Sequence, residues 1–176
     1  IYNRGACRSY FKMKFPNLRL RRLRENPKLR ALVAENHLLL KELVQPLFVK
    51  EGLDRSVEIA SMPGQFQFSF TALLEEAKAL ETLGVPAIIL FGIPAKKDLS
   101  AKYAAARNGI TQKAIAAIKK KCPNLLVIAD VCLCEYTDHG HCGVINDHAV
   151  DNDKTLELLQ KQAVCHARAG ADMVAP

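Results

Sequence analysis

The sequence lacks the features that mark non-globular and membrane proteins. It has no tryptophan and only 6% aromatic residues, yet 49% of its 176 residues are hydrophobic and 24% are charged. This composition excludes wholesale disorder, a collagen-like fibre and a disulfide-rich miniprotein. No apolar run approaches the roughly 18 residues that span a bilayer, and the first residues lack the apolar middle of a secretory signal. We therefore expect a cytoplasmic protein without membrane contact.

The net charge of +7 is unevenly distributed along the chain. Residues 1–50 contain 12 Lys and Arg against 3 Asp and Glu, whereas residues 51–176 contain 13 against 15. Only the N-terminal arm is basic, which raises the possibility of nucleic-acid contact. No aromatic residue lies between Arg19 and Arg30, so a stacking platform for bases is missing. A solvated arm, or one that docks on another subunit, is the favoured interpretation.

From Pro46 onward, short apolar runs alternate with helical patterns. In chain order we expect a strand at 46–50, a helix at 72–83, a strand at 87–93, a helix at 111–121, a strand at 125–133, a helix from 153 to about 170 and a strand at 173–175. Thr111 and Asp153 are the expected N-caps of the second and third helices, and Gly84 and Gly170 are the expected stops of the first and third. Such alternation predicts an α/β fold with a parallel sheet and right-handed crossovers.

Two architectures fit this order of elements: a doubly wound open sheet and a (β/α)₈ barrel of which only part is present. No glycine-rich phosphate loop follows the first strand, which weighs against a dinucleotide-binding sheet. A parallel strand at the very end of the sequence has no following helix, so we expect the chain to be cut from a longer fold. Ahead of the first strand, Asn26 and Pro27 predict the start of a short helix in the arm.

Residues 130–143, with the sequence DVCLCEYTDHGHCG, are the richest in candidate ligands. Side chains two apart on a strand point the same way, so Asp130, Cys132 and Cys134 are expected to share one face. That face lies at the carboxyl end of the third strand, where ligands of parallel α/β folds bind. Cys142 returns to them through a glycine-flanked loop. Three thiolates suit Zn²⁺ and leave a fourth tetrahedral position open, as in a catalytic site.

Spacing alone leaves other interpretations of these cysteines open. A structural zinc site would recruit His139 or His141 as a fourth ligand, although Cys-x-Cys is tighter than the usual zinc knuckle. A disulfide between Cys132 and Cys134 is disfavoured, because strand geometry places their side chains about two strand rises apart. The cysteines could also be small buried hydrophobes, but their acidic and imidazole neighbours argue against this.

The segment strongly resembles the zinc-binding segment of the δ-aminolevulinic acid dehydratase family, whose members are also called porphobilinogen synthases. The similarity covers about residues 18–176 and includes Met62-Pro-Gly, Asp151-Asn-Asp and AGADMVAP at 169–176. The cysteine triplet is its most specific part. The resemblance implies a (β/α)₈ TIM barrel, of which this chain supplies about the first half, with four strands.

On this basis the chain has three expected parts. Residues 1–17 match nothing in the family and are expected to form a disordered tail. Residues 18–44 correspond to the N-terminal arm and helix, and residues 45–176 to the incomplete barrel. Family members are homo-oligomers, usually octamers, in which the arm embraces a neighbour. The basic arm is therefore expected to contact a partner subunit and not nucleic acid.

The resemblance also implies an activity, the condensation of two 5-aminolevulinate molecules to porphobilinogen with loss of water in haem and tetrapyrrole synthesis. Cys132, Cys134 and Cys142 would hold the Zn²⁺ that binds and polarises the second substrate, and Asp130 would lie in the same active-site mouth. Mg²⁺ is a second candidate metal, to which no residue can be assigned.

One family feature is missing from the sequence. The two lysines that form Schiff bases with the substrates belong to strands beyond Pro176, so we expect this chain to be an inactive fragment of a lyase by itself. The alternative function is that of a non-catalytic βα module with a structural zinc site.

Overall fold

The computed structural model describes residues 21–176, so the predicted tail at 1–17 lies outside the described residues. The chain divides into two compact units, one ending at Leu38 and the other spanning Leu39–Pro176. In the first unit, helix α1 (Arg22–Glu25) precedes helix α2 (Pro27–Leu32). The predicted start of α2 is confirmed, because Asn26 Oδ1 accepts a hydrogen bond from the Lys28 amide at 2.8 Å.

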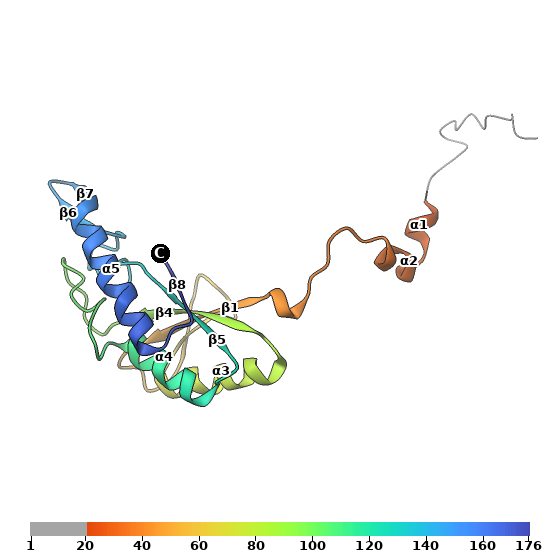
Figure 1. The fold of residues 1–176 in the computed structure, drawn as a ribbon, viewed down its shortest axis with the longest axis horizontal. Helices are drawn as coiled ribbons and strands as arrows, with labels where there is room; N and C mark the ends of the chain where they lie inside the picture. The colour runs from red at the N-terminus through yellow and green to blue at the C-terminus, as the bar shows by residue number, and fades with distance from the viewer. Residues whose placement is uncertain (1–20) are drawn as a thin grey trace, which may run out of the picture. The chain divides into compact units, whose positions relative to one another are not determined.

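The second unit alternates strands and helices (Figure 1). Its elements are η1 (Leu40–Glu42), β1 (Val44–Lys50), β2 (Val57–Glu58), β3 (Phe66–Phe68), α3 (Phe70–Leu83), β4 (Ala87–Ile93), α4 (Ile110–Lys121), β5 (Leu126–Asp130), β6 (Val144–Asn146), β7 (Ala149–Asp151), α5 (Asn152–Ala169) and β8 (Met173–Ala175). The four strands and three helices expected from the sequence are present as β1, β4, β5, β8 and α3, α4, α5. Strands β2, β3, β6 and β7 were not expected, because runs of two or three residues are too short to show a periodicity.

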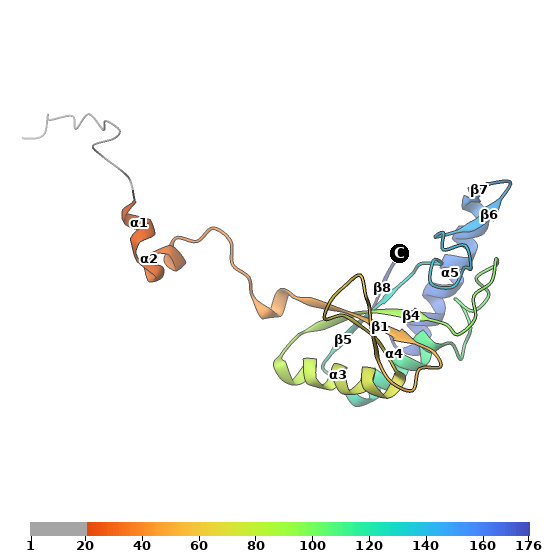
Figure 2. The same cartoon turned by 180° about the vertical axis from the view of Figure 1, so that it is seen from behind.

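The order of the strands distinguishes the two candidate architectures. Strands β1, β4, β5 and β8 are neighbours in chain order and all parallel, with β3 and β2 added beyond β1. A doubly wound sheet reverses its order at a switch point, whereas a barrel adds each new strand next to the last. Figures 1 and 2 show α3, α4 and α5 on the same side of this sheet. The second unit is therefore an α/β structure with the topology of part of a TIM barrel.

The core lies between the sheet and helices α3 and α4. Alternate residues of a strand face opposite sides, so every second residue of β1, β4 and β5 points at the helices. The buried side chains of this core include Leu47, Val49, Leu73, Ala77, Ile88, Leu90, Ala114, Ile115, Ile118, Val127 and Ala129. Residues between them face the other side of the sheet, where the rings of Phe48 and Phe91 stack at 5.0 Å.

The predicted N-cap of α4 is wrong. The helix begins at Ile110 with Gly109 as N-cap and no capping side chain, so Thr111 lies within the first turn. The Thr111 hydroxyl instead forms a buried hydrogen bond with the hydroxyl of Tyr136 at 2.7 Å. Gly92 of β4 allows this inward position, because a Cβ there would collide with Thr111 Oγ1. A tertiary contact thus displaces the local capping preference.

The predicted N-cap of α5 is wrong by two residues. Asp151 Oδ1, not Asp153, caps the helix by accepting a hydrogen bond from the Lys154 amide at 3.1 Å. The expected glycine ends of α3 and α5 are confirmed at Gly84 and Gly170, whose φ angles of 84° and 102° are left-handed. No helix within residues 21–176 combines the length and apolar character needed to cross a membrane.

Candidate metal centre

The third predicted strand is shorter than expected, and this changes how the candidate ligands are positioned. Strand β5 ends at Asp130, so Cys132 lies just before the turn that follows and Cys134 lies within it, and neither is on a strand. The carbonyl of Leu133 closes this turn by accepting hydrogen bonds from the amides three and four residues further on, both at 2.9 Å. The expectation that strand alternation aligns these side chains is therefore wrong, and the turn positions them instead.

The turn and the loop after it bring three sulfur atoms together. The Sγ atoms of Cys132, Cys134 and Cys142 all lie within 4.8 Å of one another, and those of Cys132 and Cys134 are 3.3 Å apart. Cys142 reaches the cluster from the loop between β5 and β6. Because the chain turns, the argument that strand geometry holds the first two thiols apart is also wrong. These three cysteines are free thiols, as are Cys122 and Cys165.

Two carboxyl groups lie beside the sulfur atoms. Asp130, Cys132 and Glu135 form a second group whose candidate ligand atoms lie within 4.8 Å of one another. Burial, and after it the charge of Glu135, raises the pKa of Asp130 to about 6. The Cys134 thiol donates to Glu135 Oε2 at 3.2 Å. Asp130, at the end of β5, is thus adjacent to the sulfur cluster.

The surroundings favour protonated thiols as long as no cation is bound. Burial raises the pKa of both Cys132 and Cys134, and the neighbouring Glu135 carboxylate raises both further. A divalent cation reverses this balance because it binds thiolates and releases their protons. Three sulfur donors within 4.8 Å of one another fit Zn²⁺, which prefers such soft ligands.

His139 and His141 belong to the same loop but not to the sulfur cluster. His139 Nδ1 accepts a hydrogen bond from the His141 amide at 3.1 Å, and the His141 carbonyl accepts one from the Thr137 hydroxyl at 2.9 Å. The His139 imidazole and the His141 backbone therefore shape the loop between Cys134 and Cys142. Among the residues described, no imidazole nitrogen completes a four-ligand site with the three sulfurs.

Contacts from a distant loop hold the turn in place, and sequence reasoning missed them. Lys97 Nζ donates to the Cys134 carbonyl at 3.3 Å, and the Asp98 amide donates to the Tyr136 carbonyl at 3.1 Å. Burial raises the pKa of Tyr136 to about 12, so its phenol stays protonated and bonded to Thr111. No spacing rule links these positions, so only the folded chain could reveal them.

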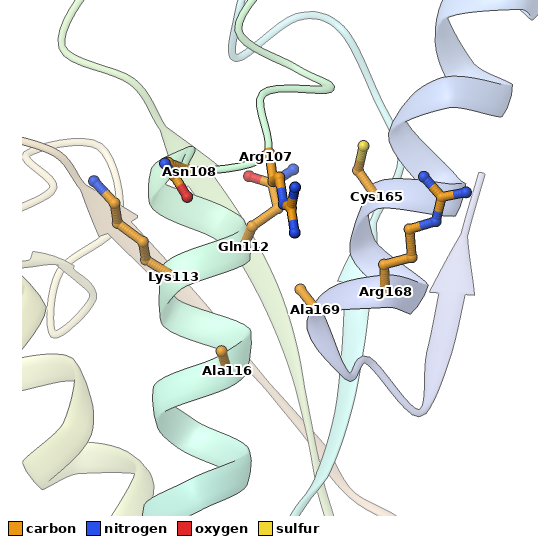
Figure 3. Close-up of a pocket in the computed structure, with 8 residues that line it drawn as sticks. All are labelled: Arg107, Asn108, Gln112, Lys113, Ala116, Cys165, Arg168 and Ala169. Carbon is orange, nitrogen blue, oxygen red and sulfur yellow. The ribbon is translucent and has the colours of Figure 1, made fainter.

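A separate cavity of about 650 Å³ lies between α4 and α5 (Figure 3). Arg107, Lys113 and Arg168 line it, and all three are exposed. Cys165, which also lines the cavity, donates its thiol hydrogen to the Ala105 carbonyl at 3.3 Å. No candidate metal ligand lines this cavity, so it is distinct from the sulfur cluster.

Comparison with known proteins identifies relatives over most of the chain. A profile described as Delta-aminolevulinic acid dehydratase matches residues 17–176. The chain is 51% identical over 164 residues to the delta-aminolevulinic acid dehydratase of Methanothermus sociabilis, a match that covers 93% of this chain and 51% of that protein. It is 51% identical over 166 residues to the protein of the same name from Synechocystis sp., covering 92% of this chain and 51% of that one. The chain therefore spans about half the length of these relatives.

A solved structure shares the fold. The delta-aminolevulinic acid dehydratase (porphobilinogen synthase) of Toxoplasma gondii ME49, in complex with the reaction product porphobilinogen, matches with a TM-score of 0.84 and 40% sequence identity. The match covers 89% of this chain and 46% of that chain. Sequence and fold thus lead to the same group of proteins.

Proposed function

The chain belongs to the δ-aminolevulinic acid dehydratase family, and from this premise we propose that it is the metal-carrying part of a porphobilinogen synthase. The proposed reaction joins two 5-aminolevulinate molecules into porphobilinogen with loss of water. The similarity to the T. gondii enzyme, whose structure contains porphobilinogen, supports this substrate class.

The observation that carries the proposal is the three-sulfur cluster. Cys132, Cys134 and Cys142 offer three ligands within one loop, and neither loop histidine joins them. Structural zinc sites close with four protein ligands, whereas catalytic sites keep one position for water or substrate. We therefore propose a catalytic Zn²⁺ at these cysteines, in preference to Mg²⁺, which requires oxygen ligands.

The chain's own residues have distinct proposed tasks at this site. Bound Zn²⁺ supplies Lewis acidity toward a substrate heteroatom. Cys132, Cys134 and Cys142 hold the ion at the carboxyl end of β5, the end of a parallel sheet where substrates bind. Asp130 is proposed to hydrogen-bond the amine of a bound 5-aminolevulinate, because its half-buried carboxyl lies beside the ligands. The Schiff-base chemistry of the family is assigned to no residue of this chain.

A second copy of the chain is the proposed partner of the arm. The arm exposes large apolar side chains, including Leu23, Leu32 and Leu38, which are 57%, 80% and 83% exposed. Exposed apolar side chains of this size are typical of a surface that another subunit covers. This feature supports a homo-oligomer in which residues 18–44 contact a neighbouring subunit.

A chimera tests the proposed reaction. Residues 17–176 would replace the matching half of the M. sociabilis enzyme, and porphobilinogen formed from 5-aminolevulinate would be measured. We expect turnover by the chimera, and a loss of about 100-fold or more when Cys132, Cys134 or Cys142 is changed to serine. Cys165→Ser, a matched change on α5 outside the cluster, is expected to retain turnover.

Zinc content separates the two parts of the proposal. The 176-residue chain should bind one Zn²⁺, and the Cys132→Ser variant should bind it far more weakly. A chimera that binds zinc but forms no porphobilinogen would contradict the assigned reaction. A chain that binds no zinc would contradict the metal site.

A further inference from the structure

We infer that helix α5 positions the metal ligands, with Gln162 and Thr155 holding the two ends of the cysteine loop, residues 132–144. This role rests on the metal site proposed above. Neither residue offers a ligand atom to the sulfur cluster. Thr155 and Gln162 lie 13 and 20 residues after Cys142 in the sequence. Their contribution is to fix the backbone on which the ligands stand.

Gln162 holds the first end of the loop. Its Nε2 donates a hydrogen bond to the Cys132 carbonyl at 3.0 Å. Gln162 is 1% exposed, so its amide group lies away from bulk water. Because a buried amide that loses its acceptor is costly, this bond restrains the backbone of Cys132, whose Sγ lies 3.3 Å from that of Cys134.

Thr155 holds the other end. Its Oγ1 accepts a hydrogen bond from the Val144 amide at 3.0 Å, two residues after Cys142. The same hydroxyl donates to the Asp151 carbonyl at 2.6 Å, which leaves its lone pairs directed at the loop. Gly143 permits the close approach, since a Cβ at that position would lie 2.7 Å from Thr155 Oγ1.

Between these two bonds, α5 packs directly on the turn. Leu158 and Leu159 pack against a buried apolar cluster that contains Leu133 and Tyr136 of the turn. The two hydrogen-bonding residues of α5 are seven positions apart, which places them two turns or roughly 10 Å apart on the same helix face. One face of α5 therefore contacts the start, the middle and the end of the segment that carries the cysteines.

This arrangement holds the three thiols together before an ion arrives. A loop that has to be ordered by the metal loses conformational freedom on binding, and this loss weakens the affinity. Residues that orient metal ligands from outside typically change metal affinity by about 10- to 100-fold when they are mutated. We therefore expect Gln162 and Thr155 to affect zinc affinity although they do not touch the ion.

The test measures zinc affinity of the 176-residue chain by competition with a chromophoric chelator. Gln162→Met keeps the side-chain length and removes the donor, and Thr155→Val keeps the shape and removes the hydroxyl. We expect each change to weaken zinc binding about 10-fold. Thr155→Ser retains the hydroxyl and should restore parental affinity. Gln160→Met alters an exposed glutamine of the same helix and should leave affinity unchanged.

Amide hydrogen exchange of the metal-free chain gives a second readout that does not depend on zinc. The Val144 amide should exchange faster in Thr155→Val than in the parent or in Thr155→Ser.

Parental zinc affinity in Gln162→Met and Thr155→Val would overturn the role of α5 while leaving the metal site intact. The role is equally overturned when the loss of affinity vanishes after correction for the folded fraction, measured by circular dichroism. A parent that binds no zinc overturns the metal site, and the exchange rates then decide whether α5 holds the loop.

Discussion

The core behind the sheet and the cysteine loop are held by different interactions. The core consists of apolar side chains such as Leu90 and Ile115, which are fully buried. Around the loop, the buried polar residues Thr111, Thr155 and Gln162 form hydrogen bonds between separate elements. Apolar burial has no preferred direction, whereas a hydrogen bond requires a defined geometry. The comparison teaches that the core supplies stability and that the polar contacts place the thiols.

The largest expected effect comes from the core. Ile115 of α4 is 0% exposed. Ile115→Ala removes buried methyl and methylene groups and should lower the free energy of unfolding by about 2–5 kcal/mol. Zinc affinity of the remaining folded chain should be unchanged, because no polar contact to the loop is lost. Denaturant unfolding and chelator competition measure the two quantities. Leu83→Ala, at an exposed position of α3, is the control and should cost less than about 0.5 kcal/mol. Equal losses from both variants would contradict the assignment of the core.

A pH effect of similar size should come from the polar face of α5. Burial lowers the pKa of His166 to about 4, and neither ring nitrogen has a hydrogen-bond partner in the described part of the chain. As pH falls, His166 takes up a proton near pH 6.5 in the unfolded chain but only near pH 4 in the folded chain. Stability should therefore fall by up to about 3 kcal/mol as pH drops across this range. His166→Leu should flatten this part of the pH profile of unfolding, whereas His148→Leu, at an exposed site, should leave it unchanged. A profile that His166→Leu does not alter would show that other groups cause the pH dependence.

The smallest effect is expected between the two regions, where α4 meets the loop. Tyr136→Phe removes the partner of the buried Thr111 hydroxyl and should destabilise the protein by about 1–3 kcal/mol. Because Tyr136 also lies in the turn, exchange of the loop amides should accelerate, which would distinguish this change from Ile115→Ala. Tyr103→Phe is a matched control at a partly exposed position. Unfolding and hydrogen exchange that match the parent would indicate that this contact does not link α4 to the loop.

Much of the fold was predictable from local patterns. The continuous apolar run at 87–93 coincides with β4, and the glycines at 84 and 170 end their helices as expected. Such signals depend only on residues a few positions apart, so the structure that they predict does not depend on the rest of the fold. The predicted N-caps Thr111 and Asp153 were wrong. Several nearby residues can occupy the N-cap position of a helix, and contacts with distant elements decide among them.

The composition of the candidate site was also predictable, but its geometry was not. Cys132, Cys134 and Cys142 were expected to meet, and their sulfur atoms do. The expected reason, a shared strand face, was wrong because β5 ends at Asp130. The run VIADVCL at residues 127–133 does not indicate the residue at which the strand ends and the turn begins.

The sequence by itself determined which residues are candidate metal ligands and which segments become strands and helices, because residue type and periodicity are local properties. Tertiary structure alone decided how the thiols approach one another. Gln162, Thr155 and Lys97 are separated in sequence from the cysteine loop that they support. Their hydrogen bonds form only once α5 and the loop after β4 pack against this loop. Hydrogen bonds between distant segments depend on the position of both partners, and no spacing along the chain encodes that position.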